Sequence, residues 1–134
     1  MSDFLQLIET AQTELSKGVR ESFEDFNITI EQFRVLQALK GQKTGLSADK
    51  LALKSNVLGP SLSRMLKKLE KDDLISRKIA PKDQRINILK LTRKGAGLSR
   101  KLETRFNKTI TSPESRTKTE SLVEKLCTQL KQAS

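Results

Sequence analysis

Residues 74–92, LISRKIAPKDQRINILKLT, contain the signal that decides the fold class of this chain. Two β-prone runs, 74–80 and 86–91, flank the polar tip PKDQR at 81–85. This spacing predicts two strands joined by a short connection, which is a β-hairpin. Nearly all the remaining sequence has helical periodicity. We therefore predict a mainly α fold with a small β-hairpin (α+β).

Apolar residues at spacings of three and four predict helices on both sides of the hairpin. Thr29 with Gln32 resembles a capping box, and Ser47 and Thr92 are further candidate N-caps. Pro113 suits the start of a helix and would interrupt the interior of one. The predicted helices cover residues 4–26, 30–40, 48–55 and 60–73 before the hairpin, and after it one that starts beyond Thr92 and one that starts at Pro113.

The charge of the chain is concentrated in one part of it. The 134 residues, taken as a single domain (1–134), carry a net charge of +10. Residues 59–105 hold fourteen Lys and Arg against five Asp and Glu, a net +9. Such a localised excess indicates one face built for a polyanion, whereas an evenly basic chain is typical of ribosomal or RNA-coating proteins.

Composition argues against several other classes of protein. The chain has no His, Trp or Tyr, and Gly41 and Gly45 lack the context of a phosphate-binding loop, so we expect no enzyme, no metal site and no cofactor. The single cysteine, Cys127, excludes an internal disulfide. We interpret it as a small buried hydrophobe, with a redox sensor as the alternative. Residues 1–10 are acidic and amphipathic, unlike a signal peptide, and a cytoplasmic protein is expected.

Residues 47–72 have the pattern of a helix-turn-helix: a short helix, the tight connection NVLG at 56–59, and a second helix with a polar outer face. A helix entering the DNA major groove needs short or flexible polar side chains there. Arg64 can reach a guanine edge and the lysines can reach phosphates; a merely solvated charged face is the alternative. The predicted DNA contacts of this helix are Pro60, Ser61, Ser63, Arg64, Lys67 and Lys68.

The hairpin that follows has the properties of a DNA-binding wing. A basic tip can place one arginine in the narrow minor groove, and we expect Arg85 in that role. Asp83, two residues away, can accept hydrogen bonds from the guanidinium and fix its direction, although a plain turn containing Asp is the alternative. Arg77, Lys82 and Gln84 complete the predicted DNA-binding set.

These residues resemble the MarR family of winged helix-turn-helix regulators, and most closely its regulators of aromatic-acid degradation, such as the homoprotocatechuate operon repressors. The resemblance extends over residues 10–105. It rests on four motifs: the Pro60-Ser61 start of the second helix, the run LEKDDLI into the first wing strand, Asp83-Gln84-Arg85 at the tip, and Leu91-Thr92 followed by Gly95.

The resemblance implies a homodimeric repressor of transcription that binds a pseudo-palindromic operator. It also implies dimerisation helices at 1–27 and 98–134, and a DNA-binding part at 29–92 with the wing at 74–91. A pocket between these parts would bind a small aromatic carboxylate as effector. Two alternatives stay open: a regulator that binds DNA without any ligand, and a generic basic RNA-binding or structural protein.

Overall fold

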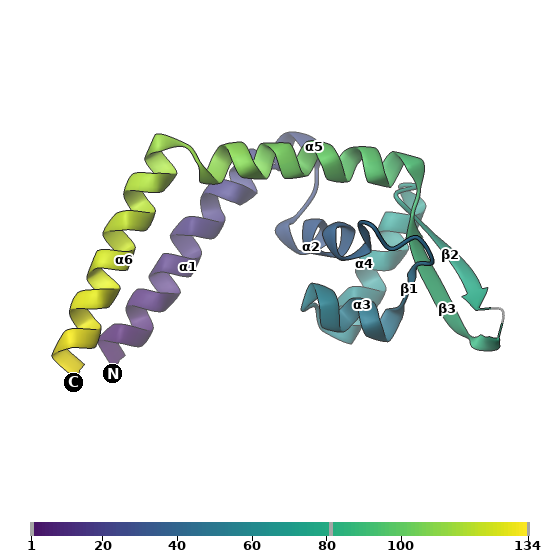
Figure 1. Cartoon of the computed structure of the whole chain (residues 1–134), viewed down its shortest axis with the longest axis horizontal. Helices are drawn as coiled ribbons and strands as arrows, with labels where there is room; N and C mark the ends of the chain where they lie inside the picture. Colours follow the sequence, from purple (N-terminus) through teal and green to yellow (C-terminus); the bar gives the residue numbers. More distant parts are fainter. Residues whose placement is uncertain (1, 81, 134) are drawn as a thin grey trace. The chain divides into compact units, whose positions relative to one another are not determined.

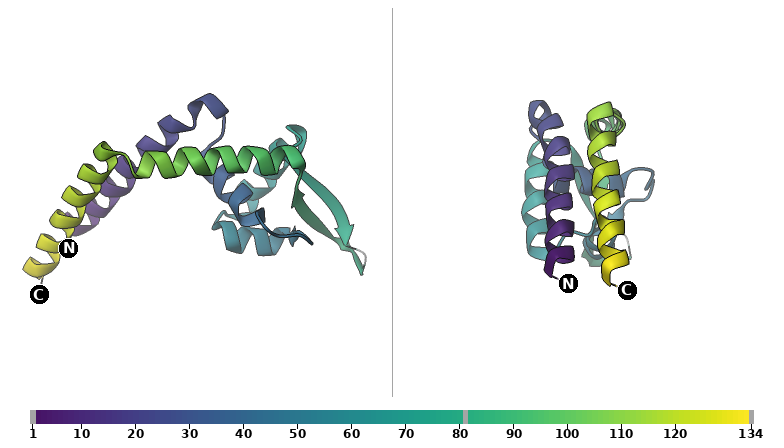
Figure 2. Two further views of the ribbon diagram at one scale, coloured as in Figure 1. Left: turned by 45° about the horizontal axis from the view of Figure 1, so that its top comes forward. Right: turned by 90° about the vertical axis from the view of Figure 1, so that its left-hand side faces the viewer.

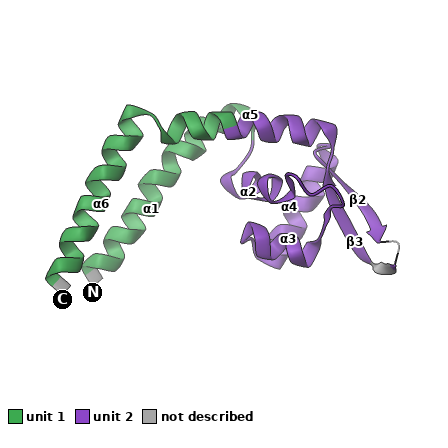
Figure 3. Cartoon of the chain, in the orientation of Figure 1, with its two compact units in different colours: residues 1–27, 104–134 green, residues 28–103 purple. Residues whose placement is uncertain are grey.

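The computed structural model describes residues 2–80 and 82–133, without the side chains of residues 2, 83–85 and 133. It is mainly helical with one small antiparallel sheet, which confirms the predicted fold class (Figure 1). The chain forms two compact units, residues 1–27 with 104–134, and residues 28–103 (Figure 3). The elements are α1 (Ser2–Ser22), the 3-10 helix η1 (Glu24–Phe26), α2 (Ile30–Leu39), β1 (Leu46–Ser47), α3 (Ala48–Ser55), α4 (Gly59–Lys71), β2 (Ile75–Ala80), β3 (Asp83–Leu91), α5 (Arg93–Ile110) and α6 (Pro113–Ala133).

In the unit made of both chain ends, α1 and α6 run side by side (Figure 2). The helix predicted over 4–26 is shorter than expected, because α1 ends at Ser22. The Ser22 hydroxyl donates to the carbonyl of Val19 at 2.7 Å, a local bond that competes with helix propagation. Phe26 is the last residue of η1, and Asn27 follows it in the left-handed conformation with φ 54°. The predicted start of α6 at Pro113 is confirmed.

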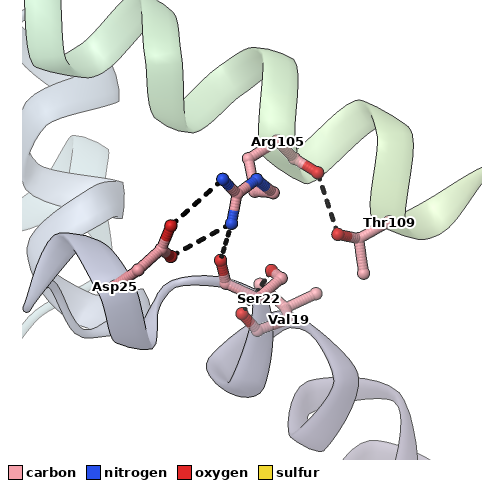
Figure 4. A network of polar contacts seen from close by, with 5 residues as sticks. All are labelled: Val19, Ser22, Asp25, Arg105 and Thr109. Atoms are coloured by element: carbon pink, nitrogen blue, oxygen red, sulfur yellow. Dashed lines mark hydrogen bonds and ion pairs between the residues drawn. The ribbon is translucent and has the colours of Figure 1, made fainter.

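Arg105 connects α5 to the end of α1 and to η1 (Figure 4). Its guanidinium donates to both carboxylate oxygens of Asp25, at 3.0 and 3.2 Å, and to the carbonyl of Ser22 at 2.7 Å. The same group lies 4.9 Å from the centre of the Phe26 ring, a cation–π distance. The hydrogen bond from Arg105 is the main reason why the pKa of Asp25 is lowered from its usual value.

The second unit contains a three-stranded antiparallel sheet in the order β1-β3-β2. Strand β1 lies between two predicted helices, where the sequence pattern indicates no strand, and its Leu46 and Ser47 pair with Leu89 and Ile88. Two residues are too few for a period-2 pattern, so only the pairing with β3 defines this strand. Gly45 makes the approach possible, because it has φ +80° and a Cβ there would lie 2.6 Å from Leu89 O.

The helices of this unit are placed by local caps and by one shared core. The capping box of α2 is confirmed: the Thr29 hydroxyl accepts from Gln32 N at 3.1 Å, and the Gln32 side chain accepts from Thr29 N at 3.0 Å. Gln37 of α2 donates to the buried Ser99 hydroxyl of α5 at 2.9 Å. The largest fully buried apolar side chains of the unit are Val35, Leu36, Leu39, Leu51, Leu69, Leu89 and Leu102.

Cys127 is exposed on α6, so the expectation of a buried cysteine is wrong for the chain by itself. Among the described side chains of this helix Leu122 is the buried one, and the helical repeat places Cys127 about 140° around the axis from it. No helix in the described part of the chain is long and apolar enough to span a membrane. Among the same residues, no three His, Cys, Asp or Glu side chains cluster as metal ligands would.

Candidate nucleic-acid interface

Helices α3 and α4 are joined by the three residues Asn56, Val57 and Leu58, a connection of helix-turn-helix length. Ser47 caps α3 as predicted, accepting from Lys50 N at 3.4 Å. Asn56 closes α3 in the left-handed conformation with φ 55°, and the side chain of Val57 is buried. Gly59, expected in the connection, is the first residue of α4.

Helix α4 has one buried face and one cationic face. Leu62, Leu66 and Leu69 are buried, and Met65 beside them is half-buried. The helix was expected to reach residue 73 but ends at Lys71, because Asp73 has φ 59° and reverses the chain so that Leu74 N bonds to Leu69 O at 2.9 Å. The predicted contacts lie on α4, with Pro60, Ser63, Arg64, Lys67 and Lys68 exposed and Ser61 half-buried.

The predicted wing is present as the β2–β3 hairpin, which extends past the helices of its unit (Figure 1). Its strands differ from the expected 74–80 and 86–91: β2 begins at Ile75 and β3 already begins at Asp83. Ala80 pairs with Asp83 after a register shift between Ile79 and Ala80. Such an irregularity lets a strand continue past a mismatch in the pairing. The residue pattern of one strand does not reveal it, because it depends on both strands.

The predicted wing contacts are described to different extents. Lys82 is exposed in the turn between the strands. The backbone of Asp83, Gln84 and Arg85 forms the start of β3, but their side chains lie outside the described part of the structure. The orientation of Arg85 by Asp83 therefore stays a prediction.

Arg77, the remaining predicted contact, is engaged within the protein. Its Nε donates to Oε1 of Glu70 at 2.9 Å, and its Nη2 donates to Oε2 at 3.4 Å. Sequence reasoning missed Glu70 as a functional candidate, because it considered only cations and short polar residues on α4. Glu70 in LEK (69–71) and Arg77 in SRK (76–78) carry opposite charges. This is the signal in the sequence that could have indicated the link between helix and wing.

The motif Leu91-Thr92 followed by Gly95 has a packing explanation. The Thr92 hydroxyl accepts from Gly95 N at 2.9 Å, which confirms Thr92 as the cap of α5, and donates to Asp73 O at 2.6 Å. A Cβ at Gly95 would overlap the carbonyl oxygen of Leu74. The start of α5 is thus seated on the turn that leads from α4 into the wing.

Residues 28–86, which include the helix-turn-helix and most of the wing, match the model of the MarR family. The winged helix of this chain is therefore similar to that of the MarR family. The chain is also similar to the solved structure of the transcriptional regulator PA4135, with 28% identity, a TM-score of 0.71, and 95% of this chain and 94% of that chain covered. No curated protein matches it.

Two S. aureus structures are similar to this chain as well. A variant of S. aureus MepR has 26% identity and a TM-score of 0.70, with 93% of this chain and 96% of that chain covered. The S. aureus MepR–DNA complex has 25% identity and a TM-score of 0.72, with 92% and 96% covered. The chain therefore shares the winged-helix fold of these structures.

Proposed function

We propose that this protein is a homodimeric transcriptional repressor that binds a pseudo-palindromic operator through α4 and the β2–β3 wing. The observation that carries the proposal is the cationic outer face of α4, opposite three buried leucines and directly followed in the chain by the wing. A two-fold symmetric dimer presents two such helices, so its operator should contain two related half-sites about one helical turn apart.

Within each half-site, we assign different tasks to the exposed cations. Arg64 is suited to read a guanine, because its planar guanidinium can bond to two acceptors on the major-groove edge. Lys67 and Lys68 are suited to phosphates, which position the helix without reading sequence. At the wing, Arg85 would enter the minor groove with its direction fixed by Asp83, and Gln84 and Lys82 would contact the adjacent backbone.

Exposed apolar side chains on both terminal helices support the dimer. A second copy of the chain would cover the exposed side chains of Leu5, Ile8, Leu15, Val123 and Leu130. Large apolar side chains exposed on two neighbouring helices are typical of interaction surfaces. We assign the dimer contact to the compact unit 1–27 with 104–134, which is somewhat smaller than the 1–27 and 98–134 expected from sequence.

Selection of bound duplexes from a random library tests the function. We expect enrichment of one inverted repeat, and a slope of log K against log salt of at least about −4, because each phosphate contact contributes about 0.9. A single-stranded RNA pool of equal length serves as the competitor. Equal binding to the RNA pool, or a slope near zero, would favour a generic basic protein over an operator-binding regulator.

We further propose release of the operator by a small aromatic carboxylate, an idea that rests on the resemblance to regulators of aromatic-acid degradation. Linkage then requires DNA to weaken effector binding by the same factor. Titration of benzoate- and cinnamate-type acids into the protein–DNA complex tests this step, with acetate as the matched carboxylate without a ring. If no aromatic acid releases the DNA, the ligand-independent regulator is the better description.

A further inference from the structure

The first turn of α4 is capped differently from those of its neighbours. Leu58 occupies the N-cap position, with φ −64° and ψ 146°, and makes no side-chain cap bond. Serine or threonine at this position typically stabilises a helix, and leucine does not. Helices α2, α3, α5 and α6 each have a side-chain hydroxyl that accepts a hydrogen bond from a backbone N–H of the first turn. These hydroxyls belong to Thr29, Ser47, Thr92 and Ser112.

Leu58 is also one of the most exposed large apolar side chains described, at 80% of its surface. The neighbouring Val57 is buried and anchors the connection, so the turn holds Leu58 on the outside. A Cβ built at Gly59 would meet nothing within 4 Å, so the space beside Leu58 is open as well. An apolar side chain thus stands in solvent at the end of the helix that faces DNA, where a cap residue would stabilise the protein more.

We propose that Leu58 is a specificity-determining residue that contacts the 5-methyl group of a thymine in the major groove, an inference that rests on the proposed operator binding. In helix-turn-helix proteins the amino-terminal residues of the second helix contact base edges. The thymine methyl is the apolar group that the major groove presents to such residues. Leu58 can bury this methyl group and thereby distinguish thymine from cytosine at that position.

The spacing to Arg64 predicts where this thymine lies. Arg64 follows six residues after Leu58 in the sequence, which corresponds to about 9 Å along a helix axis. At about 3.4 Å per base pair, the thymine should lie within about three base pairs of the guanine that Arg64 reads. A contact between two copies through Leu58 is the competing explanation for its exposure, and the oligomeric state distinguishes the two.

The test replaces each thymine of the selected duplex, one at a time, by deoxyuridine, which lacks only the methyl group. We expect one position in each half-site at which the full chain binds about fourfold more weakly, the effect of one methylene-sized apolar group. Leu58→Ala should bind the thymine and deoxyuridine duplexes equally well. Leu53→Ala is the matched control, because Leu53 is 85% exposed on α3, and it should keep the fourfold preference.

Leu58→Ser separates this role from folding. A serine at the N-cap supplies the missing hydroxyl, so this variant should unfold at the same or a higher urea concentration than the unmutated chain. It should nevertheless lose the preference for thymine. A stable variant with altered base preference cannot be explained by damage to the fold.

Three outcomes would overturn the inference. Either no deoxyuridine position weakens binding by the unmutated chain, or Leu58→Ala retains the same preference, or Leu58→Ala changes the oligomeric state in sedimentation. In all three, an enriched inverted repeat would leave the proposed operator binding intact. If the selection enriches no duplex, both the proposed function and the role of Leu58 are wrong.

Discussion

Arg77 on β2 is bound to Glu70 on the last turn of α4 by two hydrogen bonds, of 2.9 and 3.4 Å. The two side chains are 33% and 29% exposed, so water screens the pair in part. Pairs of this kind stabilise proteins by only about 0–1 kcal/mol. The contact joins α4, the helix proposed to bind DNA, to the first strand of the wing, and we therefore expect it to influence the direction of the wing more than the stability of the fold.

Arg77→Ala should weaken operator binding while leaving its salt dependence nearly unchanged. The charge of Arg77 is already balanced by Glu70, so removing it should not change the number of counterions that leave the DNA when the protein binds. Lys67→Ala is the contrasting variant, because it should reduce the slope of log K against log salt by about 0.9 for each phosphate contact removed. Fluorescence anisotropy at four or five salt concentrations measures both slopes.

Glu70→Ala should behave like Arg77→Ala, even though it removes a negative charge from the proposed DNA-binding region. If the two residues act as one positioning unit, the double variant should be no weaker than either single variant, which a double-mutant cycle measures. Tighter binding by Glu70→Ala would instead mean that Arg77 contacts phosphate when it is released.

Gly95→Ala should destabilise the protein by about 1–3 kcal/mol or more, since the added methyl group would overlap the backbone of Leu74. Gly97→Ala on the same helix is the matched control. A Cβ there would meet only the Arg100 side chain, at 4.0 Å. Because alanine is the better helix former, this control should be stabilising by about 0.5–1 kcal/mol. Urea denaturation followed by circular dichroism compares the two, and equal effects would contradict the packing explanation.

Acid should remove the contribution of the Asp25–Arg105 pair to stability. The folded-state pKa of Asp25 is lowered from 3.8, mainly by the hydrogen bond from Arg105. The stabilisation is therefore fully present above pH 3.8 and is lost as the pH falls through the folded-state pKa. Asp25→Asn should flatten the stability profile between about pH 5 and pH 2. Glu24→Gln, which makes the same change of formal charge at the adjacent residue, should keep the slope.

Leu130→Glu should convert the proposed dimer into a folded monomer. Leu130 is 56% exposed in the single chain, so a carboxylate there costs little unless a second copy covers it. Gln132→Glu adds the same charge at an exposed position of the same helix and should remain dimeric. Sedimentation velocity gives the oligomeric state, and helical content by circular dichroism shows that the monomer is folded. A folded monomer of the unmutated chain at micromolar concentration would contradict the proposed interface.

Local signals in the sequence were sufficient for most of the helical elements. Thr29 with Gln32, Ser47 and Pro113 act within one turn of their own helix, and each helix begins where these residues predict. The cationic face of α4 was predictable in the same way, because the helical period alone separates Arg64 and Lys67 from the leucines. The hairpin was visible as two β-prone runs around a polar tip.

The ends of elements and the partners of side chains depended on contacts that no local pattern contains. Strand β1 exists only because Leu46 meets Leu89, a residue far along the chain. Ser22, at the end of α1, and Asp25 both bind Arg105, about eighty residues later in the sequence. The exposure of Cys127 depends on which face of α6 packs against α1.

The sequence by itself determined the fold class, the helix-turn-helix and the location of the positive charge, since propensity, capping and periodicity act over a few neighbouring residues. Only the tertiary structure decided that Glu70 holds Arg77, that Gly95 leaves room for the turn at Leu74, and that Leu58 stands in solvent. The physical reason is that periodicity determines which face of an element is apolar, but not which distant group that face will meet. These tertiary contacts form only when all elements of the chain pack together, because burial and hydrogen bonding in one element depend on the others.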